Sequence, residues 1–326
     1  KRKFDGYDTE VTLSTILSNA SRPCFLFGVT PPRKGTSAGK CREICAKFVA
    51  RSRTLATDGF IVYDIQDEST RNSGPRPFAF RELMDPSWYA SLFRAESGKD
   101  CLVYKCCPTS DSVEHFEAWL DQSVSLHGHC AYNLVGAASS LPVGETHPGP
   151  SVEEAASLLH RSNEDSSASK PSVHFGCVAI AERHLAKNRE HENMVRKIGW
   201  GAEWFVSQGI FDTEATIALL NDYGALCKAR GIVPKKVLLT FVPCGRTKTM
   251  DFIRWLGMNV PADVEARIFS ASSSSSTTTA AAAATMDKVT KTTASPPSTP
   301  VQESCKLAQE NLTKILESTA GCGVPL

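Results

Sequence analysis

The sequence predicts an α/β protein whose parallel strands alternate with helices and close into a (β/α)8 barrel. Three observations lead to this fold class. Apolar runs rich in β-branched and aromatic residues recur along the chain, and segments with helical spacing separate them. No Gly-x-Gly-x-x-Gly follows the first run, which disfavours an open, doubly wound sheet. Without its two loop-like stretches, the chain of 326 residues approaches the roughly 250 residues of one closed barrel.

Seven apolar runs are expected to form strands. They lie at residues 24–30, 59–65, 101–106, 130–135, 174–180, 203–207 and 236–242. An eighth strand is expected to begin at residues 323–326 and to be cut short there. Because a barrel without a full eighth strand exposes an apolar edge, we expect the native chain to continue past Leu326.

Helices are expected between the strands. One begins at Asp212, a good N-cap residue, and ends at Gly231, with Leu220 and Tyr223 on its apolar face. Another begins near Ser110 and carries apolar residues at a spacing of three and four.

The chain is expected to be a single barrel domain over residues 1–326, interrupted twice. Residues 141–172 are rich in Pro, Gly and Ser and form an inserted loop with one short helix around 151–160. Residues 270–300 consist of Ser, Thr and Ala tracts, which bury too little apolar area to offset their chain entropy. We expect this second insertion to be a disordered low-complexity loop.

Composition excludes several partners. The 36 basic and 35 acidic side chains leave a net charge of +1, too small to gather nucleic acid or anionic lipid. No run of 18 apolar residues predicts a membrane span. The 12 cysteines are scattered without metal-ligand spacing, as expected of reduced thiols in the cytoplasm. The incomplete-looking N-terminus leaves a mitochondrial location open, and a homo-oligomer is equally open.

Polar residues gather where strands are expected to end, and barrel sites are built at that face. Asp64, Gln66 and Glu68 follow the second strand, Glu182 follows the fifth, and Gln208 ends the sixth. Asp64, Glu68 and Glu182 are the candidate catalytic carboxyls, because a carboxyl buried alone can hold a proton near neutral pH. Alternatively, Asp64 and Glu68 lie in a solvated loop or form salt bridges with the nearby arginines, and have no catalytic role.

Gln208 and Gln66 are the candidate substrate-binding residues. An amide that ends an apolar strand would be costly to bury without a polar partner, which favours a ligand at Gln208.

The chain also resembles a known family. Its residues 25–33 read Phe-Leu-Phe-Gly-Val-Thr-Pro-Pro-Arg, and Glu182-x-His184 is followed by Gly-Ala-Glu-Trp-Phe-Val-Ser-Gln-Gly-Ile-Phe-Asp at 201–212. These segments are similar to methylenetetrahydrofolate reductases, and the similarity covers nearly all of the chain outside the two insertions. The resemblance implies a (β/α)8 barrel that binds FAD and uses NAD(P)H to reduce a folate or another pterin-like small molecule.

The resemblance also implies roles for individual residues. Gln208 falls on the family's substrate-contacting glutamine, and His184 on a histidine that contacts the flavin. Lys197 falls on a lysine that holds the cofactor's phosphates, and Glu190 on an acidic residue at the ribose or adenine side. Gly136 lies in the motif that places the flavin ring, which completes the cofactor-binding candidates.

Two departures from the family pattern bear on the chemistry. Gly28 stands where the family has its proton-donating glutamate, and Ala137 where it has the aspartate beside the flavin. Neither residue can move a proton. The main hypothesis is therefore an NAD(P)H-dependent reductase of divergent site, with FAD in doubt. The alternatives are a catalytically lapsed barrel that binds a folate or flavin-like ligand in a regulatory role, and a different small-molecule reaction at Asp64 and Glu68.

Overall fold

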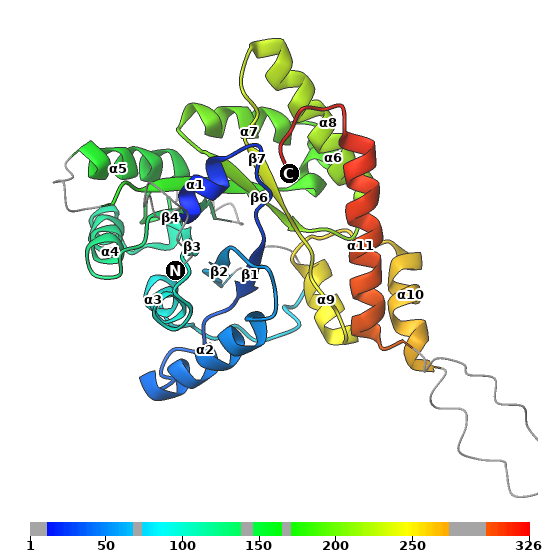
Figure 1. Ribbon diagram of the computed structural model, residues 1–326, viewed down its shortest axis with the longest axis horizontal. Coiled ribbons are helices and arrows are strands. Elements are labelled where there is room, and N and C mark those ends of the chain that lie inside the picture. Colours follow the sequence, from blue (N-terminus) through cyan, green and yellow to red (C-terminus); the bar gives the residue numbers. More distant parts are fainter. Residues whose placement is uncertain (1–11, 68–73, 138–145, 165–170, 274–297) are drawn as a thin grey trace, which may run out of the picture.

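A single parallel sheet forms the centre of the protein. The computed structural model describes residues 12–67, 74–137, 146–164, 171–273 and 298–326. Seven strands follow one another in chain order across the sheet (Figure 1). They are β1 (Leu26–Val29), β2 (Gly59–Val62), β3 (Cys101–Cys106), β4 (Ala131–Val135), β5 (His174–Ala179), β6 (Trp204–Gly209) and β7 (Lys236–Thr240). All seven expected strands are confirmed.

The sheet curls as a barrel does. One buried inner cluster joins Ile61 of β2 and Leu102 of β3 to Trp204 of β6 and Leu238 of β7, although the first two strands lie far from the last two in the sheet order. Gly176 of β5 makes room for the largest of them, because a side chain there would collide with the indole ring of Trp204. A larger outer cluster packs between the sheet and its helices. The barrel-like α/β fold is therefore confirmed.

Helices alternate with the strands along the chain (Figure 1). They are α1 (Leu13–Ser18), α2 (Ala38–Ser52), α3 (Pro86–Ser97), α4 (Val113–Ser125), α5 (Val152–Glu164), α6 (Ala181–Lys187), α7 (Glu190–Gly199), α8 (Thr213–Arg230), α9 (Thr247–Trp255), α10 (Ala262–Ser273) and α11 (Pro300–Thr319).

The two helices expected from capping and spacing are both present. Asp212 caps α8 by accepting a hydrogen bond from the backbone N–H of Glu214, and Gly231 ends it with φ 65°. The expected helix near Ser110 is α4, which is capped by Ser112. Short-range capping chemistry thus determined where these helices begin and end.

Helix α1 closes the barrel at the amino-terminal ends of the strands. Leu13 and Leu17 belong to the inner cluster and are almost fully buried. The buried Lys236 ammonium at the start of β7 donates to the carbonyl oxygens of Ile16, at 2.7 Å, and Arg22, at 2.6 Å. Because these contacts join β7 to the segment that leads into β1, they bridge the two edge strands of the sheet.

The expected eighth strand is not formed by residues 323–326. The backbone N–H of Val237 donates to the Pro325 carbonyl at 2.9 Å, so the segment lies beside the first residues of β7. Proline has no N–H with which to continue a ladder. Val324 and Leu326 instead pack against the outer cluster. Phe25, just before β1, keeps 60% of its surface accessible.

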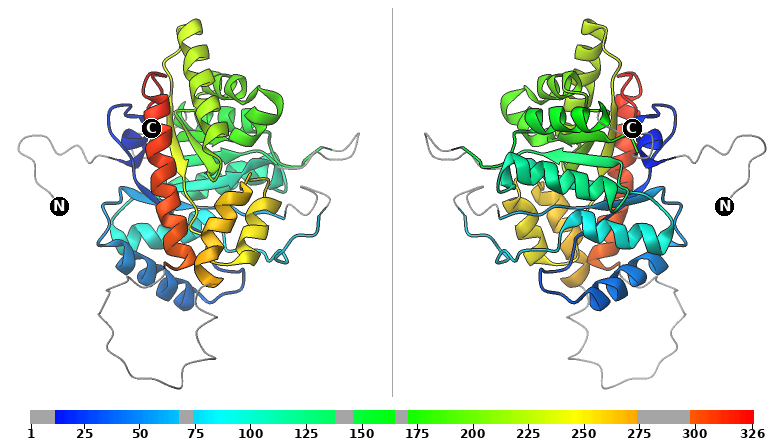
Figure 2. Two further views of the ribbon diagram at one scale, coloured as in Figure 1. Left: turned by 90° about the vertical axis from the view of Figure 1, so that its right-hand side faces the viewer. Right: turned by 90° about the vertical axis from the view of Figure 1, so that its left-hand side faces the viewer.

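The two insertions differ in what the structure describes. The first carries α5, which confirms the expected short helix. The second lies mostly outside the described residues, at 274–297, and α10 extends into its first residues. Figure 2 shows α11 lying beside α10. Arg267 of α10 joins the two helices through salt bridges to Glu303, at 2.7 Å, and to Glu310, at 2.6 Å.

Within the described ranges, no helix is long and apolar enough to cross a membrane.

Candidate functional site

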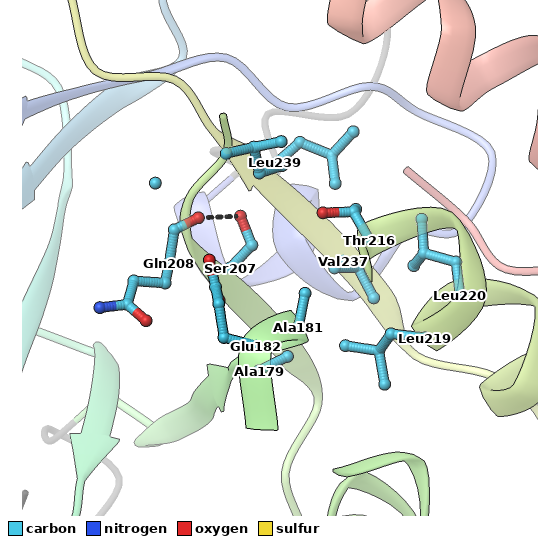
Figure 3. Close-up of a pocket in the computed structure, with 12 residues that line it drawn as sticks. Ala179, Ala181, Glu182, Ser207, Gln208, Thr216, Leu219, Leu220, Val237 and Leu239 are labelled. Carbon is cyan, nitrogen blue, oxygen red and sulfur yellow. Dashed lines mark hydrogen bonds between the residues drawn. The ribbon is translucent and has the colours of Figure 1, made fainter. Parts of the chain in front are cut away.

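Gln208 lies at a bulge near the carboxyl end of β6. The pairing of β6 with β7 shifts register between Val206 and Gly209. The Ser207 hydroxyl fills the irregularity, accepting from the Thr240 N–H at 2.8 Å and donating to the Gln208 carbonyl at 2.9 Å. Bulges of this kind redirect a side chain at a barrel rim. In Figure 3 the Gln208 side chain extends away from Leu219 and Leu220.

The Gln208 amide is only partly engaged. Its Nε2 donates to the Leu256 carbonyl, which follows α9, at 2.9 Å. Its Oε1 has no hydrogen-bond partner among the described residues. The carboxamide is thus held in place by one contact and retains an acceptor for a ligand.

A pocket opens beside Gln208 between β5, β6, β7 and helices α6 and α8 (Figure 3). It encloses about 340 Å³, including its open side. The lining residues are mainly small or aliphatic and comprise Ala179, Ala181, Glu182, Ser207, Gln208, Gly209, Ile210, Thr216, Leu219, Leu220, Val237 and Leu239. The space inside it that a water-sized sphere can reach is only about 10 Å³, which is room for one water molecule.

Glu182 is the ionisable residue of this pocket. It lies in the first turn of α6 and is half-buried, and its Oε1 accepts from the Asn259 N–H at 3.3 Å. Burial raises the pKa of its carboxyl, and the nearby Asp212 carboxylate adds to the shift. The structure therefore brings together Glu182 and Gln208, two of the candidates chosen from the sequence. A carboxyl with a raised pKa can hold a proton for transfer.

Asp64 and Gln66 form a second group, beyond the carboxyl end of β2. Asp64 Oδ2 accepts from the backbone N–H of Cys106 at 2.8 Å, and its Oδ1 accepts from Gln66 Nε2 at 2.5 Å. Burial raises the pKa of Asp64, and the nearby Lys105 ammonium partly opposes the shift. These contacts tie the β2 loop to the end of β3. Glu68 lies outside the described residues.

The cofactor-binding candidates on α6 and α7 are engaged behind β5. His184 is buried, with Nε2 at 3.1 Å from Asp222 Oδ2 on α8. Lys197 Nζ donates to the Val178 carbonyl at 2.8 Å and lies 3.8 Å from Glu190 Oε1. Glu190 in turn accepts from the Ile180 N–H at 3.2 Å. Lys197 and Glu190 thus contact the end of β5, and His184 joins α6 to α8. Their roles in binding a cofactor stay predictions.

Gly136 lies just past β4. Its carbonyl is 4.0 Å from Cys106 Sγ, and a Cβ on it would only touch Val152 at an ordinary 3.6 Å. No steric contact with the described residues requires glycine at this position, and its role in binding a cofactor stays a prediction.

Gly28 has a clear structural reason. A Cβ built on it would lie 2.8 Å from both Cε2 and the hydroxyl oxygen of Tyr63. The Tyr63 ring packs edge-on against Tyr104, with centroids 5.0 Å apart. Tyr63 therefore occupies the space into which a glutamate at position 28 would project. Burial raises the pKa of Tyr63, which keeps its hydroxyl protonated and able to donate.

Sequence patterns did not assign a role in the site to the segment after α9. Leu256 offers its carbonyl to Gln208, and Asn259 offers its N–H to Glu182. Backbone groups carry no residue-type signal, so only their position in space identifies them. Together they place the segment 256–259 over the ends of β5 and β6.

Comparisons with known proteins include a solved structure that resembles most of the chain. No family model matches the chain, and no curated protein does. A solved structure of a protein from Clostridium thermocellum is 25% identical, with a TM-score of 0.68, and the match covers 93% of this chain and 86% of that one. That protein binds two copies of 5-methyl-5,6,7,8-tetrahydrofolic acid.

Other solved structures are more distant. A lyase or mutase from Burkholderia cenocepacia, so described provisionally, is 11% identical with a TM-score of 0.39, over 81% of this chain and 86% of that one. The 4-hydroxy-tetrahydrodipicolinate synthase of Methylacidiphilum fumariolicum is 11% identical with a TM-score of 0.35, over 92% and 98%. Similarities this weak say nothing about the chemistry of this chain.

Proposed function

We propose that this protein binds a reduced folate at the carboxyl ends of its strands, with the pterin against Gln208. The observation that carries the proposal is the likeness to the folate-binding structure from Clostridium thermocellum, which extends over most of both chains. Gln208 supports it, because its fixed amide keeps an acceptor for the donor groups on a pterin edge.

The first prediction concerns Gln208. We expect Gln208→Ala to weaken the binding of 5-methyltetrahydrofolate by about tenfold, since one ligand hydrogen bond is worth roughly 0.5–1.5 kcal/mol. Isothermal titration calorimetry measures the affinity, and thermal unfolding shows whether the variant folds. Gln309→Ala, at an exposed position on α11, is the matched control and should bind like the wild type. Equal affinity in all three proteins would place the pterin elsewhere.

We propose second that the protein reduces the bound folate with NAD(P)H. The position of Glu182, a candidate proton donor, favours this reaction. In such a reaction the hydride of NAD(P)H adds to the methylene carbon of methylenetetrahydrofolate, and the bond from that carbon to N10 breaks. N10 keeps the electron pair and takes a proton, for which the candidate donor is the Glu182 carboxyl, whose pKa is raised by burial and which lines the same pocket as Gln208. The products are methyltetrahydrofolate and NAD(P)⁺.

A turnover assay tests this second proposal. NAD(P)H oxidation that depends on methylenetetrahydrofolate is expected, and Glu182→Gln should slow it at least tenfold while leaving folate affinity near the wild-type value. The absorbance of the purified protein, before and after incubation with FAD, shows whether a flavin takes part. Folate binding without turnover would favour the catalytically lapsed barrel in its place.

A further inference from the structure

A cluster of aromatic rings and cations lies next to the Gln208 contact. We call it the Arg76 cluster, and it comprises Arg76, Phe78, Phe80, Lys248, Phe252 and Trp255. Arg76 Cζ is 5.3 Å from the ring centre of Phe80, 5.2 Å from that of Phe252 and 5.4 Å from that of Trp255. Three aromatic rings around one guanidinium hold it in position, and, unlike carboxylates, they do not neutralise its positive charge.

The two cations of the cluster are not neutralised by carboxylates. Among the described residues, neither Arg76 nor Lys248 makes an ion pair, and the buried Nε of Arg76 has no hydrogen-bond partner. Lys248 is exposed, with Nζ 4.9 Å from the ring centre of Phe78, which is itself 39% exposed. A guanidinium whose donors are unused favours a planar anion, because it can bind a carboxylate through two parallel hydrogen bonds.

Two segments that are distant in the sequence contribute the residues of the Arg76 cluster. Arg76, Phe78 and Phe80 belong to the segment between β2 and α3, which pairs with the loop after β1 through an Arg33–Leu83 bridge. Phe252 and Trp255 belong to α9, and the next residue, Leu256, accepts the hydrogen bond from Gln208. The free guanidinium and the free amide acceptor therefore flank the last turn of one helix.

We propose that the Arg76 cluster binds the benzoyl-glutamate end of the folate. A carboxylate of the glutamate pairs with the Arg76 guanidinium, Lys248 adds a second charge, and the benzoyl ring packs against the exposed face of Phe78. This inference rests on the proposed folate binding, since it assigns the end of the ligand opposite the pterin. It also gives the site a preference for acidic tails over neutral ones.

The test separates the two ends of the ligand. The affinities of 5-methyltetrahydrofolate and of 6-methyltetrahydropterin, which has no tail, are measured in the wild type and in Arg76→Gln, Arg76→Lys and Lys248→Gln. We expect the wild type to bind the folate at least tenfold more tightly than the pterin. Arg76→Gln should lose most of that difference, and Arg76→Lys should recover part of it. The affinity for 6-methyltetrahydropterin should stay unchanged in every variant.

Other outcomes decide against the inference or against its premise. Equal wild-type affinity for the two ligands, or equal weakening of both in Arg76→Gln, overturns the tail site and leaves folate binding intact. Binding of neither ligand by the wild type defeats the proposed function itself. Arg42→Gln, at an exposed position of α2, controls for loss of a surface charge. If Arg76→Gln unfolds, the exposed Lys248→Gln decides, with an expected loss of about threefold for the folate alone.

Discussion

At the scale of single residues, Gly28 and Tyr63 show why one expected carboxylate is absent. The Tyr63 ring lies where a side chain at position 28 would begin, and it is held there by its edge-on contact with Tyr104. Two bulky groups cannot share this part of the barrel. The large side chain of Tyr63 therefore requires glycine at position 28. A proton donor for the proposed reduction would have to lie at another position, such as Glu182.

The steric choice can be tested by a double-mutant cycle. Gly28→Ala should lower the free energy of unfolding by about 1–3 kcal/mol, because the new Cβ meets the Tyr63 ring. In a Tyr63→Ala background the same change should cost much less, since the space is then open. Urea denaturation of the four proteins gives the coupling energy. Additive effects would show that the two positions do not compete for space.

At the scale of elements, α1 is held against the sheet by a titratable contact. His174 Nδ1 of β5 lies 2.7 Å from Glu203 Oε1, and the Ser18 hydroxyl of α1 donates to Glu203 Oε2 at 2.6 Å. The hydrogen bond to Glu203 raises the pKa of His174. Burial alone would raise the pKa of Glu203, but the hydrogen bonds from His174 and Ser18 outweigh it and lower that pKa.

The directions of these shifts predict a pH window for the stability that the pair contributes. The raised His174 pKa means that its contribution is complete below the ordinary value of 6.5 and is lost as the pH rises through the folded-state value. The lowered Glu203 pKa means that its contribution is complete above 4.5 and is lost as the pH falls through its folded-state value. The pair therefore stabilises most between these two values.

Thermal unfolding of Glu203→Gln checks this window. The difference in Tm from the wild type should be largest near about pH 5.5 and should shrink as the pH rises through the folded-state pKa of His174. Glu153→Gln, at an exposed position on α5, should show no such trend. A difference for Glu203→Gln that stays constant with pH would mean that the charge on His174 adds nothing.

At the scale of the whole molecule, the curled sheet encloses polar atoms as well as apolar ones. Asn133 of β4 is fully buried, and within the described part of the chain neither its Nδ2 nor its Oδ1 has a hydrogen-bond partner. The register places it between Tyr104 of β3 and Gly176 of β5, where the Trp204 ring lies. The buried Trp204 Nε1 is likewise without a partner. Unpaired buried groups of this kind cost free energy.

Replacing the amide should therefore stabilise the barrel. Asn133→Leu, which has a similar branched shape, should raise the free energy of unfolding by about 1–3 kcal/mol, and Asn133→Asp should lower it because a charge is buried unpaired. Urea denaturation measures both. A loss of stability in Asn133→Leu would indicate that the wild-type amide is satisfied by water inside the barrel.

Local patterns predicted much of the architecture but less of the site. Asp212 and Gly231 bound α8 through interactions within a few residues, which sequence spacing reports directly. Gln208 and Glu182 could be selected because both follow expected strands. The environment of Lys197 could not, since its contact with Val178 crosses from α7 to β5. The Arg76 cluster likewise joins residues that are about 180 positions apart.

The sequence by itself determined the alternation of strands and helices, the helix caps and the face of the fold at which polar residues end their strands. These features depend on periodicity and on interactions between near neighbours. Only the tertiary structure decided that Tyr63 fills the space beside Gly28, that Gln208 is fixed by Leu256, and that residues 323–326 pair with β7 without forming a strand. Each depends on packing between distant segments, which the curvature of the sheet brings together.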